Sequence, residues 1–533
     1  MPAPVADLVL TGARVIDPET GLDGVRAVGL TGGTITSVGA VAPPAREVWD
    51  VTGQVLAPGF IDLHSHAQST TGLRLQALDG VTTALELEAG VLPVAGAYAR
   101  AEAEGRPVNF GFSASWTDAR MHVLDGVPLD ADGSLDLFAT HQSLPNWRGP
   151  AGDRDVARVL DLLEGAVADG ALGIGVLVGY APDSGRAEYF RLAGLAARLG
   201  VPTFTHTRYI STAEPGTSLE GALEVIAAAA GTGAHMHMCH VNSTSTRMID
   251  EVAGAIDTAR RRGVRVSTEA YPYGAGATVI GAAFLAPEVL SRLGIGPQQL
   301  TYLPTGERVA DAARLAELRA ADPGGDVVVH FLDEDDPADL AVLERSFTLP
   351  DTAIATDAMP LVASGGMPLV ASGGMPLVAS GGMPLVASGG MPLVASGGEP
   401  GPGDAAGPDE WPPAPGLLTH PRSAGSYART LRWLVRERGL LTLTEALRRS
   451  SLLPAQLLED AVPAMRRKGR VQVGADADLV VLDPDTVTDH ATYTRVVPST
   501  GFRHVLVGGT PVVRDGELQL SALPGRPVRS GDR

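Results

Sequence analysis

Apolar and polar positions alternate over short distances at both ends of the chain. Near the start, β-branched runs at 7–17, 27–39 and 46–59 are separated by Gly and Pro. Residues 469–487 and 502–518 have the same character. Runs of this kind predict antiparallel strands joined by tight turns. We expect the two ends, residues 1–58 and 469–533, to pair into one small composite β-sandwich.

The middle of the chain has a different pattern, in which short apolar runs end in polar residues and alternate with helix-like segments. Residues 154–170 and 218–233, for example, carry apolar positions at helical spacing. Eight strands alternating with helices predict an α/β fold, a (β/α)8 TIM-like barrel over residues 59–468. The eight candidate strands are 60–66, 81–88, 108–113, 173–178, 201–206, 235–240, 265–271 and 353–357.

Two segments interrupt this alternation. An insertion of about 281–350 separates the seventh and eighth strands, and its "DVVVHFLDEDD" predicts a strand outside the barrel. Directly after the eighth strand, the octad MPLVASGG is repeated five times over 359–398. Each copy contains Pro and Gly-Gly, which break regular structure. A stacked module and a mobile lid are alternatives, but copies identical in every letter favour a recent expansion without a role of its own.

Candidate chemistry lies where the predicted strands end. His64 and His66 are two residues apart, so a strand points both to one face. His206, His240 and Asp357 end three further strands. In a (β/α)8 barrel the C-terminal strand ends meet at one rim, which is where active sites lie. Imidazole and carboxylate groups gathered there predict a site for a divalent metal, above all zinc.

The second strand adds two acidic side chains, Glu86 and Glu88, on one face. A carboxylate inside a barrel is costly unless a cation compensates it. Glu88 lies nearer the C-terminal end of the strand and is the better candidate to reach the metal. Glu86 is the alternative, and it could instead hydrogen-bond to a ligand.

Composition narrows the class of protein. A hydrophobic content of 44% with 19% charged residues is typical of a globular protein with a sizeable core. The net charge of −20 argues against nucleic acid and anionic membranes as partners. The N-terminal segment lacks a basic signal-peptide region, and the one cysteine, Cys239, excludes an internal disulfide. We therefore expect a cytoplasmic protein with a small-molecule partner; a homo-oligomer is compatible with this picture.

Several sequence motifs resemble those of a known enzyme superfamily. "APGFIDLHSH", "GVTTALELEAGV" and "GRVQVGADADLVVLD" are similar to those of the amidohydrolases, metal-dependent hydrolases with a barrel and a composite β-sandwich. "DGALGIGVLVGYAP", "STEAYPYGAG" and "HPRSAGSYARTLRWLVRERGLLTLTEAL" resemble the N-acyl-D-amino-acid deacylase branch. The "ELE" of the second strand resembles members that act on D-glutamate derivatives.

The resemblance implies one or two zinc ions. It gives one metal to His64 and His66 with Glu88, a second to His206 and His240, and the proton transfers to Asp357. Many superfamily members bridge two metals with a carboxylated lysine. The one lysine here, Lys468, follows every predicted barrel strand, so that bridge is excluded. The strand-two ligand is then Glu88, with Glu86 as the alternative.

The resemblance also implies a substrate that carries a carboxylate, so the pocket should offer cationic or hydroxyl donors. The candidates for substrate binding are Arg208, Ser243, Tyr271, Tyr273 and Arg422. The expected function is hydrolysis of the amide bond of N-acyl-D-amino acids, with N-acyl-D-glutamate as one candidate. The alternatives are a cyclic-amide hydrolase of the dihydroorotase or hydantoinase type, and a barrel that has lost catalysis and serves as a scaffold.

Overall fold

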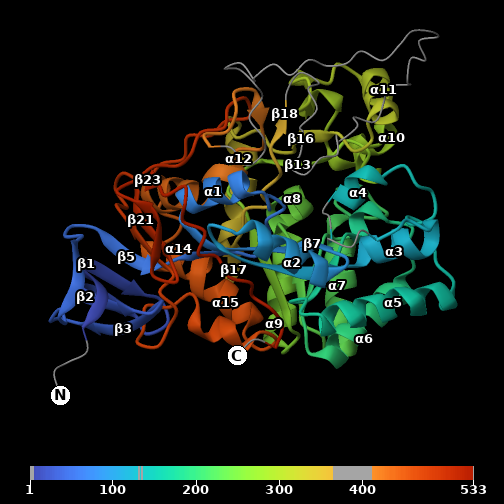
Figure 1. The fold of residues 1–533 in the computed structure, drawn as a ribbon. Helices are drawn as coiled ribbons and strands as arrows, with labels where there is room; N and C mark the ends of the chain where they lie inside the picture. The colour runs from blue at the N-terminus through green and yellow to red at the C-terminus, as the bar shows by residue number, and fades with distance from the viewer. Residues whose placement is uncertain (1–4, 130–132, 134–135, 364–410, 532–533) are drawn as a thin grey trace, which may run out of the picture.

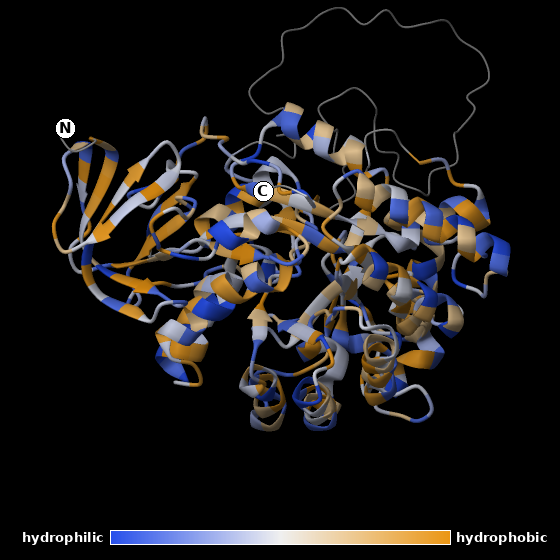
Figure 2. Cartoon of the chain, turned by 90° about the horizontal axis from the view of Figure 1, so that it is seen from below, coloured by the Kyte–Doolittle hydropathy of each residue, from blue (hydrophilic) through white to orange (hydrophobic). Residues whose placement is uncertain are grey.

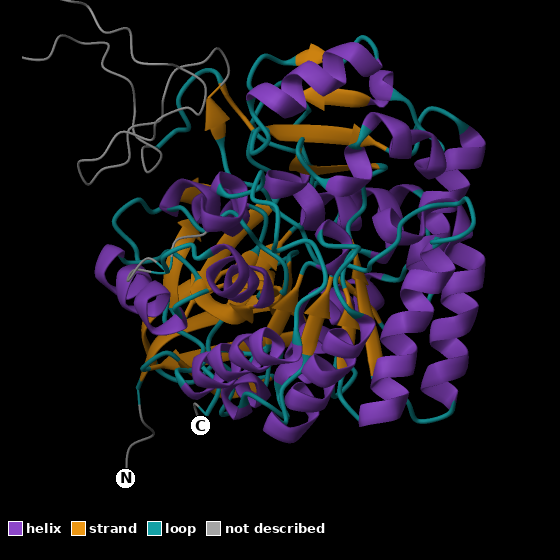
Figure 3. Ribbon diagram, turned by 90° about the vertical axis from the view of Figure 1, so that its right-hand side faces the viewer, coloured by secondary structure: helices purple, strands orange, loops and turns teal. Residues whose placement is uncertain are grey.

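A computed structural model describes residues 5–129, 133, 136–363 and 411–531. A central barrel is flanked on one side by a β domain built from both chain ends (Figure 1). A small inserted sheet stands over one end of the barrel (Figure 3). Most of the octad repeat, from residue 364 onward, lies outside the described residues. No helix in the described ranges is both long and apolar enough to cross a membrane.

The barrel is an eight-stranded parallel sheet, which confirms the predicted (β/α)8 fold. The first and last strands meet next to the site, where Ser65 and Ala358 form a parallel bridge and the His66 N–H donates to the Ala358 carbonyl at 2.8 Å. In chain order the strands are β6 (Phe60–Asp62), β7 (Val81–Val91), β8 (Asn109–Ser115), β9 (Ile174–Val176), β10 (Thr203–Thr205), β11 (Met236–Met238), β12 (Val266–Ala270) and β17 (Thr352–Ile354).

Helices surround the barrel, and they carry both apolar and polar residues (Figure 2). In α5, Val156, Val159 and Leu163 are buried at helical spacing. The helix α7 begins with a reciprocal Thr217–Glu220 capping box. The main helices are α1 (Thr70–Leu78), α2 (Val94–Glu104), α3 (Trp116–Asp125), α4 (Asp136–Thr140), α5 (Asp153–Ala168), α6 (Arg186–Leu199), α7 (Ser218–Thr232), α8 (Val241–Ser245), α9 (Ile249–Arg261), α12 (Pro337–Thr348), α13 (Arg422–Arg429), α14 (Leu443–Leu447) and α15 (Leu453–Leu458).

The β domain joins both ends of the chain, as the sequence predicts. Its sheet has the order β23-β22-β21-β20-β5-β1-β2-β3, and β4 pairs with β1. The antiparallel pairing of β5 with β20 connects the N-terminal to the C-terminal part. The strands are β1 (Ala6–Asp17), β2 (Leu22–Thr31), β3 (Thr34–Gly39), β4 (Ala45–Asp50), β5 (Val55–Pro58), β20 (Leu479–Leu482), β21 (Phe502–Val507), β22 (Thr510–Arg514) and β23 (Glu517–Leu518).

The single lysine stabilises the junction between barrel and β domain. Lys468 is 7% exposed, and its Nζ lies 2.7 Å from Asp478 and 3.0 Å from Asp476. Asp478 also accepts from the Asn109 side chain of β8 at 2.9 Å and from the Gly508 N–H at 2.7 Å. One buried carboxylate thus binds groups from both parts of the molecule, and the ammonium group compensates its charge.

The insertion forms an antiparallel sheet in the order β13-β16-β14-β15. Its strands are β13 (Ala275–Val279), β14 (Leu300–Tyr302), β15 (Glu307–Arg308) and β16 (Asp326–His330), with α10 (Pro287–Leu290) and α11 (Ala312–Ala321) beside them. The predicted additional strand corresponds to β16. The sheet already begins at Ala275, before the expected residue 281, because β13 follows β12 with no helix between them to mark the change.

Candidate metal centre and active site

Four histidines from three strand ends meet at the barrel rim. His64 and His66 follow β6, His206 follows β10 and His240 follows β11. The Nε2 atoms of His64 and His66 are 3.0 Å apart, and the His240 ring lies 5.3 Å from that of His64 and 4.8 Å from that of His206. The sequence predicts that these side chains converge, and the structure brings all four together.

The Glu88 carboxylate lies between the two histidine pairs. Its Oε2 is 3.2 Å from His64 Nε2 and 3.7 Å from His66 Nε2. Its Oε1 is 2.7 Å from His240 Nε2 and 3.2 Å from His206 Nδ1. Each oxygen thus faces one pair, which is the geometry of a ligand shared by two cations.

Electrostatics favour the ionised form of Glu88. Burial by itself would raise the pKa of this carboxyl group, but His64 and His240 hold it well below its usual value. Potential ligand atoms of His64, His66 and Glu88 all lie within 4.8 Å of one another, and the same holds for Glu88, His206 and His240. The cluster therefore provides two overlapping sets of nitrogen and oxygen donors.

Asp357 completes this rim and is held in place by an arginine. Its Oδ1 lies 3.5 Å from His64 Nε2 and 2.8 Å from Arg422 Nη2, and Arg422 Nε donates to its backbone carbonyl at 2.6 Å. Burial raises the pKa of Asp357, but Arg422 and His64 outweigh this and leave it below the usual value. Asp357 and His240 have φ of 50° and 33°, in a region that non-glycine residues rarely adopt. Such backbone strain is typical of functional sites.

Two further carboxylates orient the first histidine pair. Glu86 Oε2 lies 2.6 Å from His66 Nδ1, and Glu269 Oε1 lies 2.6 Å from His64 Nδ1. Each carboxylate accepts a hydrogen bond from Nδ1–H of its histidine, which fixes the tautomer and leaves Nε2 free to bind a cation. The placement of Glu86 matches its expected role behind a ligand, and that of Glu88 favours it as the ligand.

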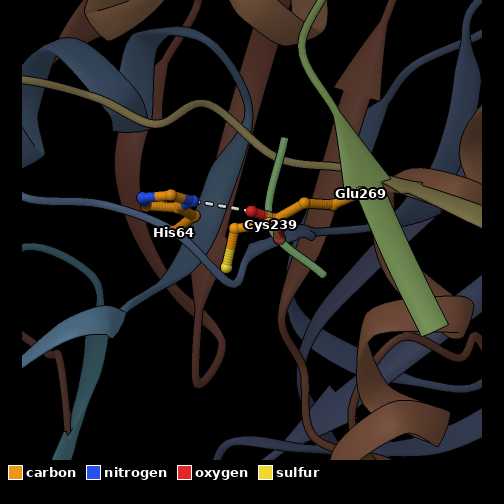
Figure 4. Close-up of side chains that lie close together, drawn as sticks. All are labelled: His64, Cys239 and Glu269. Carbon is orange, nitrogen blue, oxygen red and sulfur yellow. Dashed lines mark hydrogen bonds and ion pairs between the residues drawn. The ribbon is translucent and has the colours of Figure 1, made fainter. Parts of the chain in front are cut away.

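Sequence reasoning missed Glu269. It lies in β12, and its other oxygen contacts His237 Nε2 at 3.1 Å (Figure 4 shows its bond to His64). The argument that a carboxylate inside a barrel needs a cationic partner was applied only to the second strand. Applied to "STEA" in the seventh strand, it would have found this residue.

Cys239 lies beside His64 and Glu269 (Figure 4). Burial raises the pKa of its thiol well above the usual value, which disfavours the thiolate that a nucleophile or a metal ligand requires. We therefore interpret Cys239 as a small buried residue that contributes to packing.

The expected substrate-binding residues divide into two groups. Ser243, Tyr271 and Arg422 line the cavity above the histidines. Arg208 and Tyr273 are not among its lining residues.

The expectation for Arg208 is wrong. It is bound to Glu224 at 2.7 and 2.9 Å and to the carbonyls of Pro182 and Ser184, because β10 ends at Thr205 and the strand parity does not continue.

The structure does not bring Tyr273 to the cavity either, although Tyr271, two residues earlier, lines it. The Tyr273 ring packs against the guanidinium group of Arg429 at 4.4 Å and lies 5.5 Å from the ring of His420.

The cavity has a volume of about 430 Å³, which suits a small molecule. Its lining includes the candidate metal ligands His66, Glu88, His206 and His240 together with residues of β13 and β16 in the inserted sheet. The first residues after Asp357 also reach it: Met359, Pro360, Leu361 and Val362 are lining residues. The short pair β18 (Val362–Ala363) and β19 (Leu417–Leu418) then fixes both ends of the repeat-containing segment.

Comparisons with known proteins agree with this geometry. Residues 397–513 match the model of the Amidohydrolase family. The N-acyl-D-glutamate deacylase of Alcaligenes xylosoxydans xylosoxydans is 29% identical, over 98% of this chain and 96% of that protein. The D-aminoacylase of the same organism is 27% identical, over 95% and 94%.

A solved structure has the same fold. The crystal structure of N-acyl-D-glutamate deacylase from Bordetella bronchiseptica, complexed with zinc and a phosphonate that mimics the tetrahedral intermediate, aligns with a TM-score of 0.72 at 23% identity. The alignment covers 99% of this chain and 100% of that one. The comparisons therefore confirm the resemblance that the motifs carry, to the amidohydrolases and, among them, to the branch of the D-aminoacylases.

Proposed function

We propose that the protein is a zinc-dependent hydrolase that cleaves the amide bond of N-acyl-D-amino acids into a carboxylate and a free amino acid. The observation that carries the proposal is the Glu88 carboxylate between two histidine pairs, with Asp357 and Arg422 on the same rim. The names of the relatives support the substrate class. The barrel, residues 59–468, would carry the chemistry, and the two terminal segments would form its support.

The residues fit zinc. Zinc favours imidazole nitrogen and carboxylate oxygen, whereas magnesium and calcium favour all-oxygen sites. His206 turns its Nδ1 to Glu88 Oε1 at 3.2 Å, and its Nε2 is buried without a hydrogen-bond partner among the described residues, so no described group outside the cluster hydrogen-bonds to this imidazole. His64 and His66 with Glu88 would hold one ion, and Glu88 with His206 and His240 a second. Bound zinc would polarise the substrate carbonyl and lower the pKa of water to about 7.

Asp357 is placed to move the proton. In hydrolysis the water oxygen adds to the carbonyl carbon, the C–N bond breaks, and one water proton moves to the leaving nitrogen. Asp357 is ionised because Arg422 lowers its pKa, so it accepts this proton and then donates it to the amine. The two Arg422 contacts, 2.6 Å to the Asp357 carbonyl and 2.8 Å to its carboxylate, keep the base at the rim.

Arg422 is also the best candidate to bind the substrate carboxylate. Its Nη1 is buried with no hydrogen-bond partner in the described part of the chain. The guanidinium group lies 4.5 Å from the centre of the Tyr271 ring, and Ser243 lies on the same cavity wall. One guanidinium group would thus hold both the proton acceptor and the substrate, which fixes the distance between them.

A substrate panel tests the proposal. Zinc-loaded protein is incubated with N-acetyl-D-amino acids, their L-enantiomers and hydantoins, and release of primary amine is measured. We expect turnover of the D-series. Turnover of hydantoins alone would favour the cyclic-amide alternative. Bound zinc without turnover of any compound would contradict the proposal, and absence of zinc binding would favour the scaffold alternative.

A further inference from the structure

One side of the active-site cavity is built from aromatic rings. We call Phe138, Tyr180 and Phe284 the aromatic wall. The Tyr180 ring lies 5.1 Å from that of Phe138 and 5.2 Å from that of Phe284. Phe284 in turn stacks on His206 at 5.8 Å with an interplanar angle of 11°. The wall therefore begins directly beside a candidate metal ligand, within reach of a group attached to the scissile amide.

Aliphatic side chains extend this wall. Leu285, Leu293 and Ile295 follow β13 in the insertion and line the same cavity. Val329 of β16 and Phe331, which follows it, add to the apolar surface. An apolar cavity wall binds a hydrocarbon group of the substrate because contact removes the apolar surfaces of both from water.

Outside the histidine cluster, the described part of the cavity lining offers one basic side chain. Among its described lining residues, Arg422 alone is an arginine or lysine, and Asp357 already binds it. Arg319 donates to the Ala282 carbonyl at 2.7 Å and Arg148 to the Gln142 side chain at 2.8 Å, and neither arginine is among the described lining residues. An N-acyl-glutamate has two carboxylates, and the second would lack a partner.

Two further carboxyl groups, Asp118 and Asp326, line the cavity and add no cation. Burial raises the pKa of Asp118 to about 8 and that of Asp326 to about 7, which favours their neutral forms. A substrate carboxylate at this side would lose its hydration without gaining a cationic partner.

We propose, as a refinement that rests on the proposed function, that the aromatic wall selects a hydrocarbon group and that the protein prefers N-acyl-D-amino acids with uncharged, apolar side chains over N-acyl-D-glutamate. The hydrocarbon group in this inference is the amino-acid side chain, and contact of the wall with the acyl chain instead is one outcome of the test. This preference differs from the substrate named for the N-acyl-D-glutamate deacylase of Alcaligenes xylosoxydans xylosoxydans.

The first test uses the zinc-loaded wild-type protein and compares N-acetyl-D-methionine, N-acetyl-D-glutamine and N-acetyl-D-glutamate. The glutamine compound is the neutral isostere of the glutamate compound. We expect kcat/KM to fall in that order, with glutamate on the order of 100-fold or more below methionine because its second charge is unpaired. Glutamate turned over as well as glutamine would overturn the inference but not the proposed function. Failure of all three compounds would overturn both.

Two homologous series identify the group that contacts the wall. One lengthens the side chain from N-acetyl-D-alanine to norvaline and norleucine, and the other lengthens the acyl group of D-alanine from acetyl to butyryl and hexanoyl. Burial of a methylene predicts about a 4-fold gain in kcat/KM per methylene in the series that reaches the wall. A gain in the side-chain series supports the inference. A gain in the acyl series alone would assign the wall to the acyl chain and overturn the preference for apolar side chains, and a gain in neither series would overturn the inference as well.

A charge introduced into the wall provides the second test. Ile295 is partly exposed, so Ile295→Lys can reach water and still face the cavity. We expect the ratio of glutamate to glutamine turnover to rise at least about 10-fold in this variant, and to stay unchanged in the neutral control Ile295→Met. Leu293→Lys is a second position should the first variant fold poorly, with zinc content and melting temperature as the measures of folding. Two folded, zinc-loaded lysine variants with the wild-type ratio would overturn the inference.

Discussion

The contact between Glu269 and His64 allows a quantitative prediction about metal affinity. The two atoms lie 2.6 Å apart in a site where both side chains are 1% exposed. The substitution Glu269→Gln keeps the size and an oxygen acceptor but removes the charge. Hydrogen bonds to charged groups contribute about 1.5–3 kcal/mol, roughly one to two factors of ten in an equilibrium constant. We expect zinc to bind about 10- to 100-fold more weakly, in line with the effect of similar contacts in other metal sites.

Competition with a chelator of known affinity measures this change directly, without reference to turnover. Ser267→Ala is the matched control, because Ser267 contacts His237 at 2.8 Å but does not touch His64 or Glu269. This control should keep zinc affinity within about 3-fold of the wild-type value. The hydrogen bond that it removes reaches Glu269 only through His237. Wild-type zinc affinity in a folded Glu269→Gln protein would refute the reasoning. So would an equal loss in the control, which would assign the effect to general packing.

Four further predictions follow from the site and its surroundings. Glu88→Ala should lose zinc and activity, whereas Glu86→Gln should keep measurable zinc; metal analysis after gel filtration checks both, and full zinc with normal turnover in Glu88→Ala would exclude the bridging role. Arg422→Ala should raise KM more for an acyl amino acid than for its uncharged amide, and equal effects would remove Arg422 as the carboxylate binder. Lys468→Met should lower the free energy of unfolding by about 3–5 kcal/mol because Asp478 stays buried without its cation; urea denaturation measures this, and an unchanged midpoint would contradict it. Deletion of four octads should leave zinc binding and turnover intact, and loss of turnover with zinc retained would favour the lid.

Much of the site could be predicted because strand position alone determines where a side chain ends up in a barrel. His64, His66, His206, His240 and Asp357 needed only the strand ends and one rule of topology. Glu88 needed a further argument, the cost of a buried carboxylate, and its placement between two histidine pairs agrees with that argument.

The errors have local causes. Arg208 was assigned by strand parity beyond Thr205, where β10 has already ended. Tyr271 and Tyr273 were both expected at the end of the seventh strand, but both follow the last residue of β12, Ala270, and only Tyr271 lines the cavity. Parity holds only while the backbone stays extended, and the sequence does not mark where a three-residue strand stops.

The aromatic wall could not be predicted for a different reason. Phe138, Tyr180 and Phe284 lie on three segments that are distant in the sequence, and of the three only Tyr180 belongs to a motif, "DGALGIGVLVGYAP". Tyr180, from the barrel, packs on His206 at 4.9 Å, and Phe284 packs on it from the insertion. Their meeting depends on tertiary packing, which the spacing of residues along the chain does not show.

The buried position of Lys468 has a practical consequence. A protease specific for lysine has a single peptide bond to cut in the whole chain, and that bond lies beside an ion pair at the junction of barrel and β domain. The folded protein should resist such a protease, and each opening of the junction should yield the same two fragments. The native sequence thus contains a built-in single-site reporter of local unfolding, readable on a gel without any added label.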